Sequence, residues 1–125
     1  MSIRVLIVDD SRTYAAGIKR ILEGAPDFEV VGFAEDGVQG LAKVHELQPH
    51  VVLMDVNIPG ASGGKGVPLA RATAPIYTRF YLFSACDESK LRQLAREHKA
   101  DGYLSKSLPV AEVSRKLREL SRHAE

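Results

Sequence analysis

Short aliphatic runs alternate along the chain with longer segments whose apolar residues recur at helical spacing. The runs are rich in valine, isoleucine, leucine and aromatic residues and are bounded by aspartate, glycine, proline or serine, which is typical of β-strands. Two of them, residues 5–8 and 51–54, are apolar at every position, which favours central parallel strands covered on both faces. The pattern predicts five strands at Ile3–Val8, Phe28–Ala34, Val51–Met54, Arg79–Ser84 and 101–104.

The segments between and after these strands predict five helices. The first begins after Ser11, a good N-cap residue, ends before Gly24, and carries Ala15, Ile18, Ile21 and Leu22 at helical spacing. In the third, glycines loosen the beginning and Pro68 cannot lie deep inside a helix, so we expect it to start near Pro68. The other helices are expected over Gly37–Leu47, 88–98 and 110–122, with the third falling within 64–73.

Strands and helices that alternate through short connections indicate a (βα)5 unit of the α/β class. Right-handed crossovers then give a doubly wound, five-stranded parallel sheet with helices on both faces, and the common strand order is the flavodoxin-like 2-1-3-4-5. A chain of 125 residues fits one domain, so we expect a single domain over residues 1–125.

Composition and charge narrow the possible settings without naming a partner. Seventeen lysines and arginines face sixteen acids, so the formal charge of +1 creates no strong field toward nucleic acid or an anionic membrane. The longest aliphatic runs stop far short of a membrane span, and the first residues lack a signal-peptide pattern. Cys86 is the single cysteine, as expected in a reducing compartment. We expect a cytoplasmic protein with no nucleic-acid or membrane partner.

Polar residues follow the predicted strands at their carboxyl ends, where open α/β sheets bind ligands. Three carboxylates gathered there would repel one another unless a cation lies among them, and Mg²⁺, with Mn²⁺ as a substitute, is the natural oxygen-ligated ion. A lysine and a hydroxyl beside a metal-bound carboxylate can stabilise the oxygens of a transferred phosphoryl group, so phosphoryl transfer to a carboxylate fits. The residues at this edge are Asp9, Asp10, Asp55, Ser84 and Lys106.

Several ordered motifs together resemble the receiver domain of two-component response regulators, also called the CheY-like domain. They are Val-Leu-Ile-Val-Asp-Asp at 5–10, Ala-Glu-Asp-Gly at 34–37, Asp-Val-Asn-Ile-Pro-Gly at 55–60, Phe-Ser-Ala at 83–85 and Gly-Tyr-Leu-Ser-Lys at 102–106. The likeness covers nearly the whole chain, and the combination is far more specific than any single motif.

The resemblance implies a role for each residue of the acidic edge. Asp55 corresponds to the phosphoacceptor, and Asp9 and Asp10 correspond to the acids that hold Mg²⁺, with the backbone carbonyl of Asn57 as a further ligand. Lys106 corresponds to the lysine that binds the phosphoryl group. The implied function is a stand-alone, phosphorylation-operated switch that takes a phosphoryl group from a histidine kinase or phosphotransfer protein and catalyses only its own modification.

The resemblance also implies how the switch signals. Ser84 corresponds to the switch hydroxyl and Tyr103 to the switch aromatic, and we expect the output to be a protein contact on the face of the fourth helix, fifth strand and fifth helix. Asn57 and Cys86 lie two residues beyond the acceptor and the switch hydroxyl, so we expect them to tune the phosphoryl lifetime by controlling access of water. The arginines and lysine near the end of the chain interleave with glutamates, which favours a solvated face.

Two departures and three alternatives accompany this interpretation. Ser107, not proline, follows Lys106, so a cis peptide there is in doubt, and residues 60–66 are unusually rich in glycine. That stretch is no P-loop, because Pro59 and Gly66 stand where the motif needs glycine and a hydroxyl residue. The chain could instead be the receiver part of a longer transcription factor or enzyme, a phosphorylation-independent scaffold, or a small nucleotide-binding or flavin-binding enzyme. Two acids after the first strand argue against the last.

Overall fold

The computed structural model describes residues 2–61 and 64–123 and contains a five-stranded parallel sheet of order β2-β1-β3-β4-β5. The strands are β1 (Ile3–Val8), β2 (Phe28–Ala34), β3 (Val51–Met54), β4 (Arg79–Ser84) and β5 (Gly102–Ser105). The helices are α1 (Arg12–Glu23), α2 (Gly37–Leu47), α3 (Gly66–Arg71), α4 (Glu88–Glu97) and α5 (Val110–His123). The predicted α/β class and strand order are confirmed.

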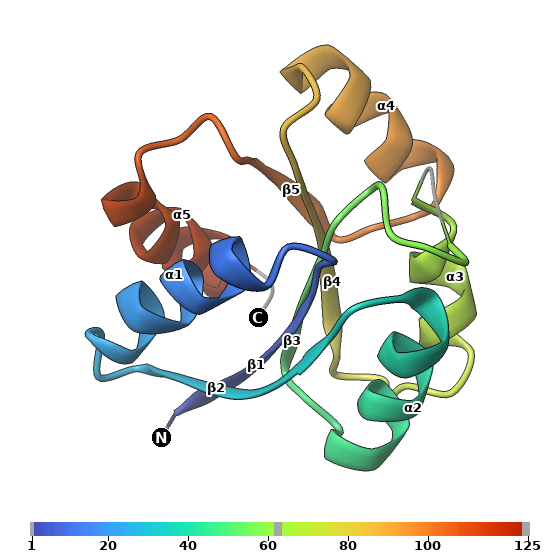
Figure 1. The fold of residues 1–125 in the computed structure, drawn as a ribbon, viewed down its shortest axis with the longest axis horizontal. Coiled ribbons are helices and arrows are strands. Elements are labelled where there is room, and N and C mark those ends of the chain that lie inside the picture. Colours follow the sequence, from blue (N-terminus) through green and yellow to red (C-terminus); the bar gives the residue numbers. More distant parts are fainter. Residues whose placement is uncertain (1, 62–63, 124–125) are drawn as a thin grey trace.

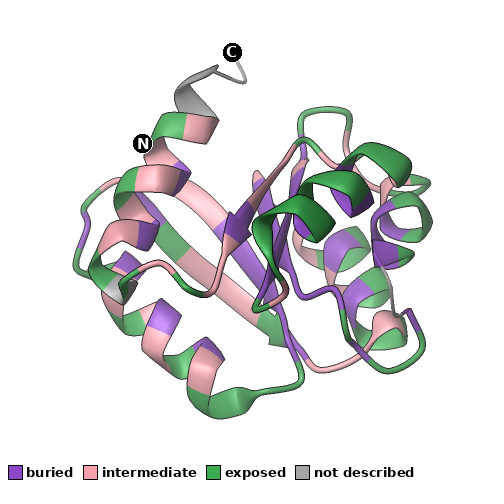
Figure 2. Ribbon diagram, turned by 90° about the horizontal axis from the view of Figure 1, so that it is seen from above, coloured by how far each residue is buried: buried purple, intermediate pink, exposed green. Residues whose placement is uncertain are grey.

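Helices cover both faces of the sheet, with α1 and α5 on one side and α2, α3 and α4 on the other (Figure 1). The central strands supply both cores, since Val5 and Ile7 pack toward α1 and α5 whereas Leu6 and Val8 pack toward the other three helices. Burial runs along these strands without alternation, as the fully apolar sequence predicts (Figure 2). Full burial of one such side chain stabilises the fold by about 1.5–3 kcal/mol.

The sheet order reverses between β1 and β3, which places a crevice outside their carboxyl ends. The two strands are paired in parallel register, with Val8 opposite Met54 at their last residues. Whatever follows these two residues therefore emerges side by side at the same edge of the sheet. The outermost strands of the sheet are β2 and β5. Because β5 is parallel to β4, its carboxyl end lies on the same side of the sheet as those of β1 and β3.

Helix boundaries follow from capping residues. The Ser11 hydroxyl accepts a hydrogen bond from the Tyr14 N–H at 3.3 Å, and Gly24 closes the same helix, as predicted. Asp36 and Asp87 cap α2 and α4 in the same way. The helices predicted at 88–98 and 110–122 instead end one residue earlier, at Glu97, and one residue later, at His123. Each described helix is too short or too polar to span a lipid bilayer.

Helix α3 differs from the prediction, because it begins at Gly66 rather than near Pro68 and ends at Arg71. Pro68 is the third helical residue, and at that position the backbone N–H has no partner inside the helix, so proline costs nothing there. Gly64 takes a backbone φ of +88°, a left-handed conformation that glycine adopts without strain. Residues 62 and 63 of the glycine-rich stretch lie outside the described residues.

Strand β5 is shifted by one residue from the predicted 101–104. Asp101 uses its carboxylate rather than its carbonyl to accept the Phe80 N–H at 2.8 Å, and pairing in the ladder starts with Gly102 opposite Tyr81. At the other end Ser105 pairs with Ser84 and extends the strand. Every peptide bond in the described residues is trans, including the bond from Lys106 to Ser107.

Candidate functional site

Three carboxylates converge at the carboxyl ends of β1 and β3. Asp9 and Asp10 follow β1 directly, and Asp55 follows β3. The Asp55 N–H donates to the carbonyl of Val8 at 2.9 Å, which continues the β1–β3 ladder one residue past the strands. One carboxylate oxygen from each of the three residues lies within 4.8 Å of the others, which is the convergence that the strand pattern predicts.

Lys106 joins this cluster from the end of β5. Its ammonium donates to Asp9 Oδ2 at 2.6 Å and to Asp55 Oδ2 at 3.2 Å, and so bridges the two buried carboxylates. The backbone supports this position, because the Lys106 N–H donates to the carbonyl of Ser84 at 2.8 Å. The side chain of Lys106 is only 13% exposed. Residues from β1, β3, β4 and β5 are thus tied together at one point.

Backbone donors orient the two buried acids. Asp9 Oδ1 accepts the Ser11 N–H at 2.9 Å, and Asp55 Oδ1 accepts the Asn57 N–H at 3.2 Å. Each carboxylate therefore has one oxygen on the backbone of its own loop and the other on Lys106. Asp10, in contrast, is exposed. The site combines two fixed carboxylates with one that faces solvent.

Burial and charge act in opposite directions on these groups. Burial raises the pKa of the Asp9 carboxyl above its ordinary value, and the hydrogen bonds from Lys106 and the Ser11 N–H offset only part of that rise. Burial alone lowers the pKa of the Lys106 ammonium, but the hydrogen bond to Asp9 and the charge of Asp55 outweigh it, so the pKa is raised overall. Lys106 is therefore a cation at neutral pH.

The two predicted switch residues lie at different depths. Ser84 ends β4 and is 2% exposed, whereas Tyr103 on β5 is half-buried against the core beneath α4. The Tyr103 hydroxyl accepts a hydrogen bond from Arg92 Nε at 3.1 Å and donates to Glu88 Oε1 at 3.5 Å, with both partners on α4. The Tyr103 hydroxyl is thus linked to α4, the helix predicted to lie on the output face.

The two predicted tuning residues occupy the loops around the acids. Asn57 has an exposed side chain, although its backbone is bound to Asp55. Cys86 is half-buried and packs against the apolar cluster between the sheet and helices α2 to α4. Both residues follow the strand ends that carry the site.

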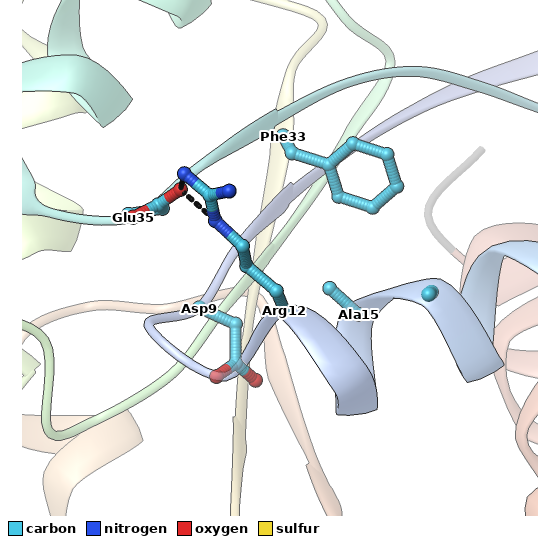
Figure 3. A pocket seen from close by; sticks show the side chains of 6 residues that line it. Asp9, Arg12, Ala15, Phe33 and Glu35 are labelled. Carbon is cyan, nitrogen blue, oxygen red and sulfur yellow. Dashed lines mark hydrogen bonds and ion pairs between the residues drawn. The ribbon is translucent and has the colours of Figure 1, made fainter.

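A pocket of about 300 Å³ opens beside Asp9, between α1 and the end of β2 (Figure 3). Phe33 and the alanines of α1 make it largely apolar, and an ion pair between Arg12 and Glu35 closes one side. The sequence offered no signal for this ion pair, because the two residues are joined only through the β1–β2 pairing.

Tyr14 is a site residue that the sequence reasoning missed. Its ring lies under the Lys106 ammonium, 4.4 Å from Nζ to the ring centroid. A signal exists, because Tyr14 precedes the buried Ile18 by one helical turn and therefore lies on the inward face of α1, close to the acids that begin it. A tyrosine at such a position is ordinarily read as core packing.

The site offers two kinds of binding group. Its carboxylate oxygens can bind a hard metal ion, and its ammonium can bind an anion. The carboxylates provide oxygen ligands of the kind that Mg²⁺ takes, and the Lys106 ammonium contacts two of them. Ser84 ends β4, the strand that pairs with β3. Asp55 is a carboxylate that touches Lys106, belongs to the acidic cluster, and stands at the switch point of the sheet.

The sequence matches the family model described as Response regulator receiver domain over residues 5–118. It is 41% identical over 86 residues to the protein-glutamate methylesterase/protein-glutamine glutaminase of Thermotoga maritima, a match that covers 69% of this chain and 24% of that protein. It is 37% identical to the response regulator GacA of Pseudomonas protegens, covering 93% of this chain and 54% of that protein. The chain thus spans about a quarter of the length of the first relative and about half the length of the second.

The fold is similar to solved structures over nearly its whole length. The crystal structure of the response regulator domain of Thermotoga maritima CheB superimposes with a TM-score of 0.84 at 32% identity, covering 99% of this chain and 96% of that one. This similarity extends over the sheet and the helices on both of its faces.

Proposed function

The chain belongs to the response regulator receiver family, and on that premise we propose that it is a phosphorylation-operated signalling switch with Asp55 as the phosphoacceptor. The observation that carries the proposal is the position of the Asp55 carboxylate, which touches Lys106 and lies in one cluster with Asp9 and Asp10. A histidine kinase or phosphotransfer protein is the proposed donor. The chain would act on no substrate other than its own phosphoryl group.

The proposed reaction moves one phosphoryl group between two side chains. An oxygen of Asp55 forms a bond to phosphorus as the bond from phosphorus to the donor's imidazole nitrogen breaks, and the imidazole leaves with the electron pair of that bond. Lys106 neutralises charge on the phosphoryl oxygens, and the Ser84 hydroxyl donates to one of them. In dephosphorylation, water attacks the same phosphorus as the bond from phosphorus to the Asp55 oxygen breaks, which releases inorganic phosphate and returns Asp55 to a carboxylate.

Mg²⁺ fits the residues present. The donor set is three carboxylates with oxygens within 4.8 Å of one another, and the backbone of Asn57 adjoins it through its hydrogen bond to Asp55. We propose that Asp10, Asp55 and the Asn57 carbonyl hold the ion directly and that Asp9 acts partly through water, since Mg²⁺ keeps several waters. The bound ion would neutralise negative charge that develops as the phosphoryl group arrives.

Asp10→Ala is expected to weaken Mg²⁺ binding about tenfold or more. Two unit charges about 4 Å apart near a protein surface interact by about 4 kcal/mol before solvation is counted, so loss of one ligand charge is a large effect. Calorimetric titration with MgCl₂ measures it, and Glu46→Gln on the exposed side of α2 is the control. An unchanged Mg²⁺ affinity in Asp10→Ala would remove Asp10 from the ligand set.

The proposed function is tested by intact mass spectrometry of the unmodified chain. Incubation with acetyl phosphate and Mg²⁺ is expected to add one phosphoryl group that hydroxylamine removes, as it does from an acyl phosphate, and a chelator should prevent the addition. Failure to gain any labile phosphoryl from acetyl phosphate, phosphoramidate or a phosphorylated phosphotransfer domain would favour the phosphorylation-independent scaffold instead.

Asn57 and Cys86 are proposed to set the phosphoryl lifetime. Both lie on loops that border the acids, so side chains there control how water reaches the phosphorus. Exchanging either for glutamate or lysine is expected to change the dephosphorylation rate several-fold without abolishing phosphorylation. Loss of the labile mass with time, after removal of the donor, gives the rate. If both sets of variants decay like the unmodified protein, these residues have no tuning role.

Ser84 and Tyr103 are proposed to carry the signal to the surface formed by α4, β5 and α5. A phosphoryl oxygen would draw the Ser84 hydroxyl inward, and Tyr103 would then exchange its hydrogen bonds with Arg92 and Glu88 for a buried position. Phosphorylation therefore shifts an existing equilibrium between two Tyr103 positions. Phosphorylation is therefore expected to release the Tyr103 hydroxyl from its hydrogen bonds to α4.

Amide chemical shifts with and without beryllofluoride measure this effect. We expect changes in α4 and around Tyr103 as well as in the loops of Asp9, Asp55 and Lys106, and Tyr103→Phe should reduce the response of α4. Changes confined to the three loops would contradict the proposed route even where beryllofluoride binds.

The output face carries charge of both signs. Four polar side chains of α4 are exposed, Lys90, Arg92, Gln93 and Arg96. Arg92 lies 3.7 Å from Glu88, Gln93 donates a hydrogen bond to Glu97, and Arg115 of α5 forms a 2.6 Å ion pair with Glu112. Arg118 of α5 pairs with Asp27, which lies in the connection between α1 and β2. These side chains support an acidic or mixed-charge protein partner rather than nucleic acid.

We further propose that residues 1–125 act as one receiver domain in the cytoplasm. The two relatives described above are longer than this chain, so a covalently attached output domain is the alternative. The length of the open reading frame distinguishes a stand-alone regulator from the receiver of a transcription factor or enzyme.

A further inference from the structure

We propose that Tyr14 is a positioning residue that holds the Lys106 ammonium at the acidic site through the face of its ring. This inference rests on the proposed function, because it concerns the lysine that would receive the phosphoryl oxygens. It adds a residue from α1 to a site otherwise built from the ends of four strands.

Two aromatic rings lie close to the Lys106 ammonium, in addition to its carboxylate partners. Lys106 Nζ lies 4.4 Å from the centroid of the Tyr14 ring and 5.8 Å from that of Phe83. Both distances fall within the range of cation–π attraction, which strengthens when water is excluded. The side chain of Lys106 is only 13% exposed, so this contact is largely shielded from solvent.

The fold holds these rings in place. Tyr14 is the third residue of α1, where its N–H is bound to the Ser11 cap, and the next residue, Ala15, is buried. Phe83 on strand β4 is 2% exposed, and its ring centroid lies 5.6 Å from that of Tyr14 with the ring planes inclined at 55°. A tilted pair of this kind is a favourable aromatic arrangement, so the Tyr14 ring has a packing partner other than Lys106.

The phenol hydroxyl does not explain why tyrosine is here. Tyr14 Oη is buried and forms no hydrogen bond with any described residue. Burial also raises the pKa of the Tyr14 phenol, which keeps the ring neutral at physiological pH and preserves its attraction for a cation. The contribution to Lys106 therefore comes from the ring, and phenylalanine should serve equally well.

A contact of this kind has a particular use at this site. The carboxylate partners of Lys106, Asp9 and Asp55, are also the groups that another cation and the phosphoryl transfer would engage. A hard metal ion takes oxygen ligands and does not compete for an aromatic face. Tyr14 would thus keep the ammonium aimed at the site while its carboxylate bonds are exchanged.

The test compares Tyr14→Leu, which removes the ring, with Tyr14→Phe, which keeps it. One readout needs no phosphodonor: ring currents should shift the Lys106 ε-methylene protons upfield, and Tyr14→Leu should return them toward the unstructured value. The second readout is the rate of phosphorylation by acetyl phosphate with Mg²⁺, expected to fall about tenfold in Tyr14→Leu. Tyr14→Phe should recover both. Tyr77→Leu removes an exposed aromatic far from the site and is the control.

Thermal unfolding identifies any loss that comes from an unfolded fraction, and rates are corrected for it. Unchanged Lys106 proton shifts and an unchanged rate in folded Tyr14→Leu would overturn the proposal, and so would a Tyr14→Phe variant as impaired as Tyr14→Leu. If the unmodified chain accepts no phosphoryl group, the proposed function fails, while the Lys106 proton shifts still decide whether Tyr14 holds the ammonium.

Discussion

Asp55→Asn is expected to lose the labile phosphoryl group entirely. The amide has nearly the same shape as the carboxylate, so the loop and the fold should survive, but its oxygen is a poor nucleophile and its charge is gone. In the structure Asp55 is the carboxylate of the cluster that both contacts Lys106 and follows the central strand β3. Intact mass after incubation with acetyl phosphate and Mg²⁺ measures the outcome.

A matched control is Asp36→Asn, because Asp36 is a partly buried aspartate outside the acidic cluster that caps α2 and that asparagine replaces well as a cap. It should accept one phosphoryl group like the unmodified chain. Retention of a hydroxylamine-sensitive adduct in Asp55→Asn would show that another carboxylate is the acceptor, with Asp9 the next to examine because it too is bound to Lys106.

Lys106→Met is expected to change two properties in opposite directions. Removing the ammonium leaves the phosphoryl oxygens without a charged partner, so the rate of phosphorylation should fall about a hundredfold or more. Mg²⁺ affinity should rise, because Lys106 no longer competes for Asp9 and Asp55, which it bridges at 2.6 Å and 3.2 Å. The extra repulsion among the acids should also lower the melting temperature until Mg²⁺ is added.

Calorimetric titration and phosphorylation kinetics on the same sample measure both effects. Lys90→Met, on the exposed side of α4, is the control and should leave both unchanged. Equal weakening of Mg²⁺ binding and phosphorylation in Lys106→Met would mean that the lysine supports the structure of the loops rather than occupying the same carboxylates.

The sheet could be predicted because two of its strands leave little choice. Residues 5–8 and 51–54 are apolar throughout, which favours the middle of a parallel sheet, and both are buried there. Once these strands are central and adjacent, the acids that follow them must meet. The acidic cluster was therefore predictable from strand ends, even though its members lie far apart in sequence.

Local exceptions were harder to predict. Helix α3 starts two residues before Pro68, because proline is harmless within a first turn, and sequence alone does not say which turn will be first. The sequence predicts Asp101 as the first residue of a strand, but its carboxylate accepts the hydrogen bond from the Phe80 N–H and the strand begins one residue later. Backbone hydrogen bonding decides both boundaries. Pro68 lies where the helix needs no N–H donor, and the Phe80 N–H is bound to a side chain instead of to the strand.

The contacts of single side chains were beyond the sequence. The ring of Tyr14 under Lys106 and the ion pair of Arg12 with Glu35 each join a residue of α1 to a residue that follows a distant strand. Periodicity places such residues on an inward face or at a strand end, but the partner depends on the twist of the sheet and the angle of α1. The polar cluster was predictable as a group, and its aromatic support was not.

The most direct test of the central claim is to locate the phosphoryl group chemically. Borohydride reduces an aspartyl phosphate to homoserine, so peptide mapping after treatment with acetyl phosphate, Mg²⁺ and borohydride reads the acceptor position. We predict homoserine at position 55, dependent on Mg²⁺ and absent when acetyl phosphate is omitted. Homoserine at another position, or none in a sample that has gained a labile phosphoryl group, would contradict Asp55 as the acceptor.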